Sequence, residues 1–124
     1  MKKYNSAIII DDDPDLCMLL KAMLNKYIAE IRFAHTIRGG EQLLKTFGSD
    51  IVFLDNNLPD GKGVMYIKEL KTIQPTAMII VISAMAGLKT LALENGADNF
   101  VEKPLTESSI KNALGLMGNE MSQG

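Results

Sequence analysis

The sequence lacks the features that mark secreted, membrane-spanning or zinc-binding proteins. Its 124 residues include one cysteine, Cys17, and one histidine, His35, so neither an internal disulfide nor a Cys/His zinc cluster can form within the chain. The opening MKKYNS leads into an apolar run of only four residues, which is too short for a signal-peptide core or a membrane span. These absences favour a protein that works in the reducing cytoplasm.

The chain also lacks an excess of charge of either sign. Thirteen basic and fifteen acidic side chains give a net charge of −2, so no overall positive field draws the chain onto nucleic acid or anionic lipid. We therefore expect no direct contact with nucleic acid or membrane. The hydrophobic share of 47% suits one compact domain over residues 1–124. We expect its core to span residues 6–117 and a polar, flexible tail to span residues 118–124.

Five short apolar runs recur along the chain and predict five β-strands. Three of the runs are apolar at consecutive positions, which is typical of strands in a parallel sheet that helices cover on both faces. The intervals between runs leave room for one helix each, as in repeated βα units. The runs are Ala7–Ile10, Ile31–Ala34, Ile51–Leu54, Met78–Ile82 and Asn99–Val101.

The segments between the runs have the spacing of amphipathic helices. The first begins with Asp13 as N-cap and Pro14 as the first helical residue. Gly39 and Gly40 argue against a start of the second helix before Glu41. The expected inward-facing sets are Leu16, Leu19, Leu20, Met23, Leu24 and Tyr27 in the first helix; Leu43, Leu44 and Phe47 in Glu41–Phe47; and Val64, Ile67 and Leu70 in Val64–Ile73. The last two expected helices are Leu88–Asn95, stopped by Gly96, and Glu107–Met117, capped by Thr106.

Polar residues end most of the expected strands, where ligands bind in an open parallel α/β sheet. Asp11 and Asp12 directly follow a buried run, and their carboxylates would repel each other and lose hydration unless a cation lay between them. Asp55 ends the third run, Ser83 ends the fourth, and Lys103 follows the fifth. The sequence therefore predicts a cation site at one edge of the sheet.

These residue types suit phosphoryl chemistry. Oxygen ligands with room for water favour Mg²⁺, or Mn²⁺, over zinc. Beside such a cation, the carboxylate of Asp55 can attack phosphorus and form an acyl phosphate. Lys103 and Ser83 offer positive charge and a hydrogen bond to the phosphoryl oxygens. We assign no mechanistic part to His35, which suits a surface position at a strand end, or to Cys17, which suits a packing position.

Four blocks of the sequence, in this order, resemble the receiver domain of response regulators, the phosphoacceptor module of bacterial two-component signalling. The blocks are IIIDDDP (Ile8–Pro14), DIVFLDNNLPDG (Asp50–Gly61), VISA (Val81–Ala84) and GADNFVEKPL (Gly96–Leu105). The resemblance covers residues 6–117. It implies a flavodoxin-like, doubly wound α/β fold, with five helices and five parallel strands in the order 2-1-3-4-5.

The resemblance also implies a role for each matched residue. The implied sets are a metal site for Mg²⁺ made by Asp11, Asp12, the phosphoacceptor Asp55 and the backbone carbonyl of Asn57, and a phosphoryl site made by Ser83, Ala84 and Lys103. The peptide bond between Lys103 and Pro104 is expected to be cis. The implied activity is the Mg²⁺-dependent transfer of a phosphoryl group from a phosphohistidine donor to Asp55.

Partners and a switch follow from the same resemblance. The donor would be a histidine kinase or a histidine phosphotransfer protein. On phosphorylation, the Ser83 hydroxyl would move toward the phosphoryl group and Phe100 would move inward; because Phe100 lacks a hydroxyl, this switch would depend on packing alone. The output face, over Leu88–Leu114, would dock a partner protein or form a homodimer.

Two other functions stay open at this stage. A pseudo-receiver would bind partners without phosphorylation; it would usually lack one of the five site residues, and all five are present here. A phosphatase of the haloacid-dehalogenase type also uses a strand-end aspartate and Mg²⁺, but it needs an acid two residues later as proton donor, where this chain has Asn57. Both a stand-alone regulator and one domain of a longer protein fit the sequence.

Overall fold

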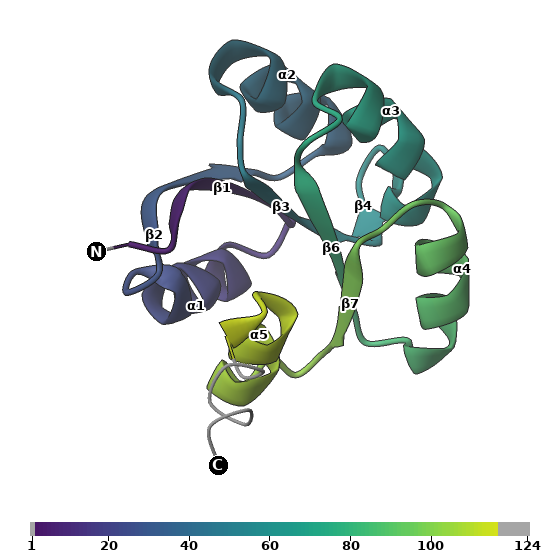
Figure 1. Cartoon of the computed structure of the whole chain (residues 1–124). Helices are drawn as coiled ribbons and strands as arrows, with labels where there is room; N and C mark the ends of the chain where they lie inside the picture. The colour runs from purple at the N-terminus through teal and green to yellow at the C-terminus, as the bar shows by residue number, and fades with distance from the viewer. Residues whose placement is uncertain (1, 117–124) are drawn as a thin grey trace.

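The structure, a computed structural model that describes residues 2–116, is built around a five-stranded parallel sheet (Figure 1). The strands stand in the order β2-β1-β3-β6-β7. Their bounds are β1 Tyr4–Ile10, β2 Ile28–Ala34, β3 Ile51–Asp55, β6 Met78–Ser83 and β7 Asn99–Glu102. Counted along the chain, this is the order 2-1-3-4-5, so the expected doubly wound α/β fold is confirmed.

Five helices cover the two faces of the sheet. Helices α1 and α5 lie on one face, and α2, α3 and α4 lie on the other (Figure 1). Short 3₁₀ turns, η1 (Gly63–Tyr66) and η2 (Ala86–Leu88), precede α3 and α4. The helix bounds are α1 Pro14–Leu24, α2 Ile37–Phe47, α3 Ile67–Ile73, α4 Lys89–Glu94 and α5 Glu107–Ala113. None of the helices among residues 2–116 has the length and apolar character needed to span a bilayer.

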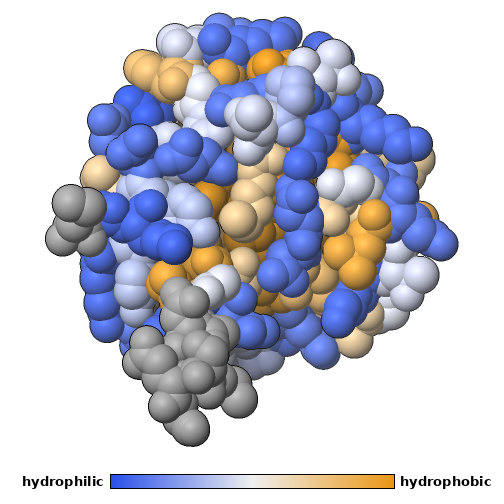
Figure 2. Space-filling view, viewed as in Figure 1, coloured by the Kyte–Doolittle hydropathy of each residue, from blue (hydrophilic) through white to orange (hydrophobic). Residues whose placement is uncertain are grey.

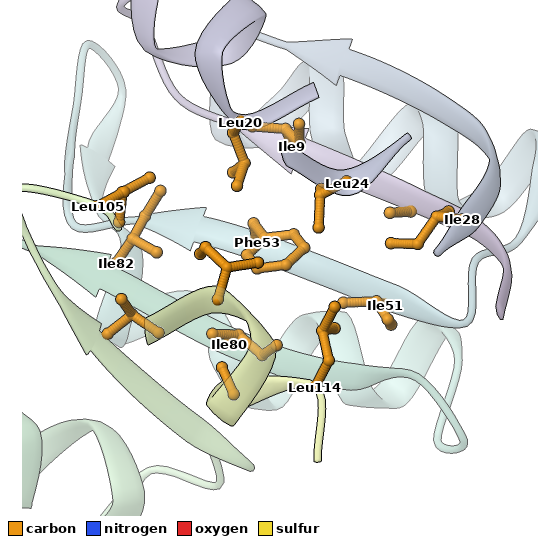
Figure 3. Packing of buried hydrophobic residues seen from close by; sticks show 14 of the residues in the cluster. Ile9, Leu20, Leu24, Ile28, Ile51, Phe53, Ile80, Ile82, Leu105 and Leu114 are labelled. Atoms are coloured by element: carbon orange, nitrogen blue, oxygen red, sulfur yellow. The ribbon is translucent and has the colours of Figure 1, made fainter. Parts of the chain in front are cut away.

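The consecutive apolar runs are explained by two separate hydrophobic layers. Side chains alternate between the faces of a strand, so Ile51 and Phe53 of β3 pack under α1 and α5, whereas Val52 and Leu54 pack under α2, α3 and α4. Phe53 is completely buried and lies at the centre of the first layer (Figure 3). Every residue of the run is therefore a core residue.

Helix α2 begins four residues earlier than its glycines suggested. Thr36 caps it at Ile37, and Gly39 and Gly40 lie inside the first turns. A glycine inside a helix lowers its stability, but no larger residue fits at position 40, because a Cβ there would lie 2.2 Å from Cδ1 of Ile10. The close packing that glycine allows offsets its low helical propensity. Gly40 lets α2 approach β1 closely.

Several other boundaries and burial predictions were wrong. Leu19 is 49% exposed and Phe47 is 57% exposed; the Phe47 ring instead lies 3.9 Å from the guanidinium of Arg32 and forms a surface cation–π contact. Helix α5 ends at Ala113, and the expected end at Met117 lies outside the described residues. Strands β1 and β2 each begin three residues earlier than expected. A small antiparallel hairpin, β4 (Asn57–Leu58) with β5 (Gly61–Lys62), was not expected at all.

Replacing Gly40 with alanine is expected to lower the free energy of unfolding by about 1–3 kcal/mol, because the added methyl group overpacks a completely buried contact with Ile10. Urea unfolding followed by circular dichroism measures the change. Gly87→Ala is the control: a Cβ there meets no atom within 4 Å, so stability is expected to stay within about 0.5 kcal/mol of the parent. Equal stabilities for the two variants would contradict this packing argument.

Candidate functional site

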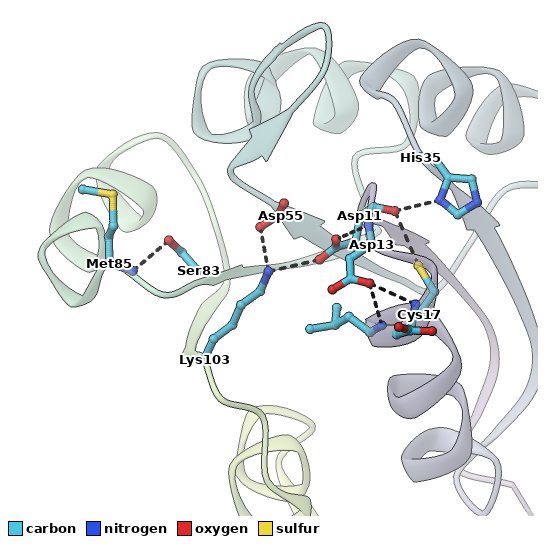
Figure 4. A network of polar contacts seen from close by, with 10 residues as sticks. Asp11, Asp13, Cys17, His35, Asp55, Ser83, Met85 and Lys103 are labelled. Carbon is cyan, nitrogen blue, oxygen red and sulfur yellow. Dashed lines mark hydrogen bonds and ion pairs between the residues drawn. The ribbon is translucent and has the colours of Figure 1, made fainter.

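The carboxyl edge of the sheet brings the expected site residues together (Figure 4). Asp11 follows β1, Asp55 ends β3, and Lys103 follows β7. The Nζ atom of Lys103 lies 3.1 Å from Oδ1 of Asp55 and 3.3 Å from Oδ2 of Asp11. One lysine therefore bridges two carboxylates that come from different strands.

Three carboxylates form the acidic cluster of the site. One oxygen from each of Asp11, Asp12 and Asp55 lies within 4.8 Å of the other two. Asp11 is 1% exposed and Asp55 is 4% exposed, whereas Asp12 is exposed. Three negative charges so close together need more compensation than one lysine gives. This donor set of oxygen atoms alone, open to water through Asp12, fits a hard divalent cation, as the resemblance to receiver domains implied.

The charges in the site shift the pKa values of both partners of the ion pair. Burial raises the pKa of the Asp55 carboxyl above its usual value, and the neighbouring Asp11 raises it further, while Lys103 acts in the opposite direction. For Lys103, burial lowers the pKa, but the charges of Asp55 and Asp11 outweigh burial and raise it. Lys103 is thus firmly cationic, and the site retains an excess of negative charge.

The turn after β1 fixes Asp11, the first residue of the acidic pair. The backbone N–H of Asp13 donates to Oδ1 of Asp11 over 2.9 Å, and the N–H of Asp11 donates to the carbonyl of Ala34 over 3.0 Å. Asp13 caps α1, as expected, by accepting from the N–H of Asp15 at 3.0 Å. Asp11 is therefore held by its backbone and by both carboxylate oxygens.

The segment after Asp55 is held by contacts that the sequence analysis missed. The side chain of the buried Asn56 accepts from the N–H of Val64 at 3.1 Å, and its carbonyl accepts from the N–H of Gly63 at 2.8 Å. A Cβ at position 63 would lie 2.2 Å from the carbonyl oxygen of Asp55. Asn57 is exposed, and its side-chain oxygen accepts from Nζ of Lys62 at 2.8 Å. These bonds join Asn56 to backbone groups seven and eight residues further along the chain, and no spacing in the sequence marked them.

Ser83 and Phe100 lie on neighbouring strands. Ser83 is 2% exposed at the end of β6, and its hydroxyl oxygen accepts from the N–H of Met85 at 3.1 Å (Figure 4). Phe100 is partly buried on β7, opposite Val81 of β6, and packs against the layer under α2, α3 and α4. The Lys103–Pro104 peptide bond is cis, the isomer that the resemblance implied.

Cys17 and His35, which were expected to have no part in the mechanism, lie in different surroundings. Cys17 is 1% exposed and packs in the core, and burial, followed by the charge of Asp11, raises the pKa of its thiol to about 11. His35 is exposed, as expected for a strand end, yet its Nδ1 atom lies 2.9 Å from the carbonyl oxygen of Asp11. A lone histidine gave no sequence signal for this contact.

Known proteins resemble this chain over nearly its whole length. Residues 7–115 match the family of the response regulator receiver domain. The chain is 34% identical to the chemotaxis protein CheY of Thermotoga maritima over 110 residues, which cover 86% of this chain and 92% of CheY. It is 32% identical to the response regulator protein PilR of Pseudomonas aeruginosa over 101 residues, which cover 80% of this chain but only 23% of PilR.

Solved structures agree with these relatives. A response regulator from Burkholderia pseudomallei, crystallised with a phosphorylated aspartic acid, a calcium ion and citrate, superposes with a TM-score of 0.77 at 26% identity over 97% of this chain and 75% of that one. The beryllofluoride-activated NtrC4 receiver domain dimer superposes with a TM-score of 0.79 at 27% identity over 92% of this chain and 97% of that one. This chain belongs to the receiver domains of response regulators, the phosphoacceptor signalling modules of two-component systems.

Proposed function

We propose that Asp55 is the phosphoacceptor and that its phosphorylation switches a surface for protein interaction. The observation that supports this most strongly is the position of Asp55, buried at the carboxyl edge of the sheet, 3.1 Å from Lys103 and beside Asp11. A carboxylate oxygen of Asp55 forms a bond to the phosphorus of a phosphohistidine as the P–N bond breaks. The bonding pair leaves with the imidazole nitrogen, which takes up a proton, and Asp55 becomes an acyl phosphate.

The metal of the site is proposed to be Mg²⁺, with Mn²⁺ as a substitute. Asp11, Asp12, Asp55 and the backbone carbonyl of Asn57 would hold it, because they offer oxygen donors only. When bound, such a cation supplies positive charge to the phosphoryl oxygens. The chain's own residues bind the rest of the group: Lys103 provides a fixed cation, Ser83 a hydroxyl and Ala84 a backbone N–H. The Ser83 oxygen accepts from Met85, which leaves the hydroxyl proton available for donation.

The donor would be a histidine kinase or a histidine phosphotransfer protein in the cytoplasm, a compartment that suits the single free thiol of Cys17.

Output would pass from Ser83 and Phe100 to the face over residues 88–114. Figure 2 shows an apolar patch in the region of α4, the helix that carries Leu91 and Leu93, exposed by 40% and 42%. That face would bind a partner protein or a second copy of this chain; the NtrC4 receiver domain, a structural relative, forms a dimer.

The two alternatives have less support. A phosphatase of the haloacid-dehalogenase type requires an acid at position 57, and the Asn57 side chain is instead bonded to Lys62. A pseudo-receiver would have no need for the close approach of Lys103 to both Asp11 and Asp55. The complete cluster therefore favours phosphorylation.

Intact-mass spectrometry after incubation with acetyl phosphate tests the proposal. In the presence of Mg²⁺ we expect the protein to gain one phosphoryl group, located on the peptide that contains Asp55, and we expect no gain in EDTA. Asp12→Ala, which removes one oxygen donor from the cluster, is expected to need more Mg²⁺ for the same gain. If the parent binds Mg²⁺ but stays unmodified, the pseudo-receiver function replaces this one.

A further inference from the structure

His35 holds the backbone at the end of β1. Its Nδ1 atom lies 2.9 Å from the carbonyl oxygen of Asp11 (Figure 4), while the N–H of Asp11 donates to Ala34, the residue before His35. Because a carbonyl oxygen can only accept, Nδ1 must carry the hydrogen. The end of β2 therefore fixes Asp11 through both its N–H and its C=O group.

The imidazole of His35 replaces a backbone hydrogen bond that a continued β1–β2 ladder would make to the Asp11 carbonyl. The pairing of β1 with β2 ends at Ile10 and Ala34, and the next bond of a parallel ladder would bring the N–H of residue 36 to the Asp11 carbonyl. No such bond joins the Thr36 N–H to the Asp11 carbonyl among residues 2–116; Thr36 begins the turn into α2, which it caps with its hydroxyl oxygen by accepting from the N–H of Gly39 at 2.9 Å. Within residues 2–116, the other donor at this carbonyl is the thiol of Cys17, at 3.5 Å, and a thiol is a weak donor.

The position of Asp12 depends on this backbone. Asp11 is fixed through several bonds, but the carboxylate of Asp12 has no hydrogen bond or ion pair among the described residues 2–116. Its distance from Asp11 and Asp55, within 4.8 Å, is set by the conformation of the chain at residues 11 and 12. Residues that hold a ligand-bearing backbone in place contribute to metal affinity without touching the metal.

We propose that His35 is a positioning residue for the acidic cluster: its Nδ1–H bond to the Asp11 carbonyl holds the carboxylates of Asp11 and Asp12 in place for a divalent cation. This inference rests on the proposed function, because it assumes that the cluster binds Mg²⁺. Both the neutral Nδ1–H tautomer and the doubly protonated ring can donate this bond.

Two substitutions at position 35 separate the hydrogen bond from the shape of the side chain. The Nδ2 atom of an asparagine lies two bonds from Cβ, as Nδ1 of histidine does, so His35→Asn can keep a donor at the same place. His35→Leu has the same branching but no donor. Thr36→Ala is the structural control, because it removes the neighbouring cap of α2 and leaves the Asp11 carbonyl bonded.

The test is a titration of the full ¹⁵N-labelled chain with Mg²⁺, followed by amide NMR. We expect His35→Leu to bind Mg²⁺ about 10-fold more weakly than the parent and His35→Asn to bind close to the parent. Thr36→Ala is expected to lose thermal stability without losing Mg²⁺ affinity. Equal affinity in the parent and His35→Leu would overturn the inference while leaving the proposed function intact.

A measurement on the parent keeps the inference testable even if His35→Leu fails to fold. Because His35 is the only histidine, the imidazole signals in a long-range ¹H–¹⁵N spectrum belong to it without ambiguity. At a pH where the ring is neutral, we expect the Nδ1-protonated tautomer, and the Nε2-protonated tautomer would overturn the inference. A parent that binds no Mg²⁺ at all would overturn both the inference and the proposed function.

Discussion

Replacing Asp55 with asparagine is expected to abolish phosphoryl uptake from acetyl phosphate. The amide has nearly the shape of the carboxylate, but its oxygen bears no negative charge and is a poor nucleophile for phosphorus. The matched control is Asp50→Asn, which makes the same chemical change just before β3, at the opposite end of that strand, where Asp50 accepts from the N–H of Asn5. Intact mass is expected to show no phosphoryl group on Asp55→Asn and one on Asp50→Asn. Continued uptake by Asp55→Asn would place the acceptor elsewhere.

The same variant is also expected to be more stable than the parent in metal-free buffer at neutral pH. The folded state raises the pKa of Asp55, first through burial and then through Asp11, so the charged carboxylate destabilises the folded chain above that pKa. As the pH falls through the raised pKa toward the value of 3.8 for the unfolded chain, the parent takes up the proton and this cost disappears. The stability difference, measured by thermal unfolding in EDTA, should therefore be largest at neutral pH and shrink in acid. A difference that grows in acid would contradict the charge argument.

The fold was predictable because burial on both faces of the sheet produces both the apolar runs in the sequence and the two hydrophobic layers in the structure. Ile8 and Ile10 face one layer while Ala7 and Ile9 face the other, so a strand buried on both sides appears in the sequence as an unbroken apolar run. The starts of β1 and β2 were missed because they lie outside these runs: Asn5 on β1 and Glu30 on β2 are exposed.

The start of α2 required knowledge of a tertiary contact. Propensity alone disfavours Gly40 in a helix, and only the position of Ile10 explains why a larger residue would not fit. The requirement for glycine at position 63 also comes from a tertiary contact, because the carbonyl of Asp55 leaves no room for a side chain there. Close approaches between distant segments leave no periodic trace in the sequence.

The charged residues of the candidate site could be predicted from the sequence, but the residues that hold the nearby backbone in place could not. Parallel strands place their carboxyl ends at one edge, so Asp11, Asp55 and Lys103 had to meet once the strand order was given. The contacts of His35 and Asn56 are bonds between a side chain and a distant backbone group. Backbone N–H and C=O groups are present near every strand end, whatever the sequence. No spacing or residue type therefore predicts these contacts.

Replacing Lys103 with methionine is expected to slow phosphorylation of the protein by acetyl phosphate about 100- to 1,000-fold, the usual effect of removing one donor that stabilises a developing anion. Lys103 contacts Asp55 and Asp11 at 3.1 and 3.3 Å, so its ammonium group lies beside the proposed phosphoacceptor, where it would meet the phosphoryl oxygens. Methionine fills a similar volume without the charge. The rate of mass gain at saturating Mg²⁺ measures the effect.

Lys71→Met is the matched control for this prediction. The Lys71 and Lys103 side chains are exposed by 27% and 24%, and each pairs with an aspartate. Lys71 contacts Asp98 at 2.7 Å, and Asp98 also accepts from the N–H of Ile79 near the start of β6, far along the strands from the acidic cluster. Loss of either ion pair can lower stability, but only Lys103→Met removes charge from the proposed phosphoryl site. Equal phosphorylation rates in the two variants would mean that Lys103 neutralises the buried aspartates without taking part in the transfer.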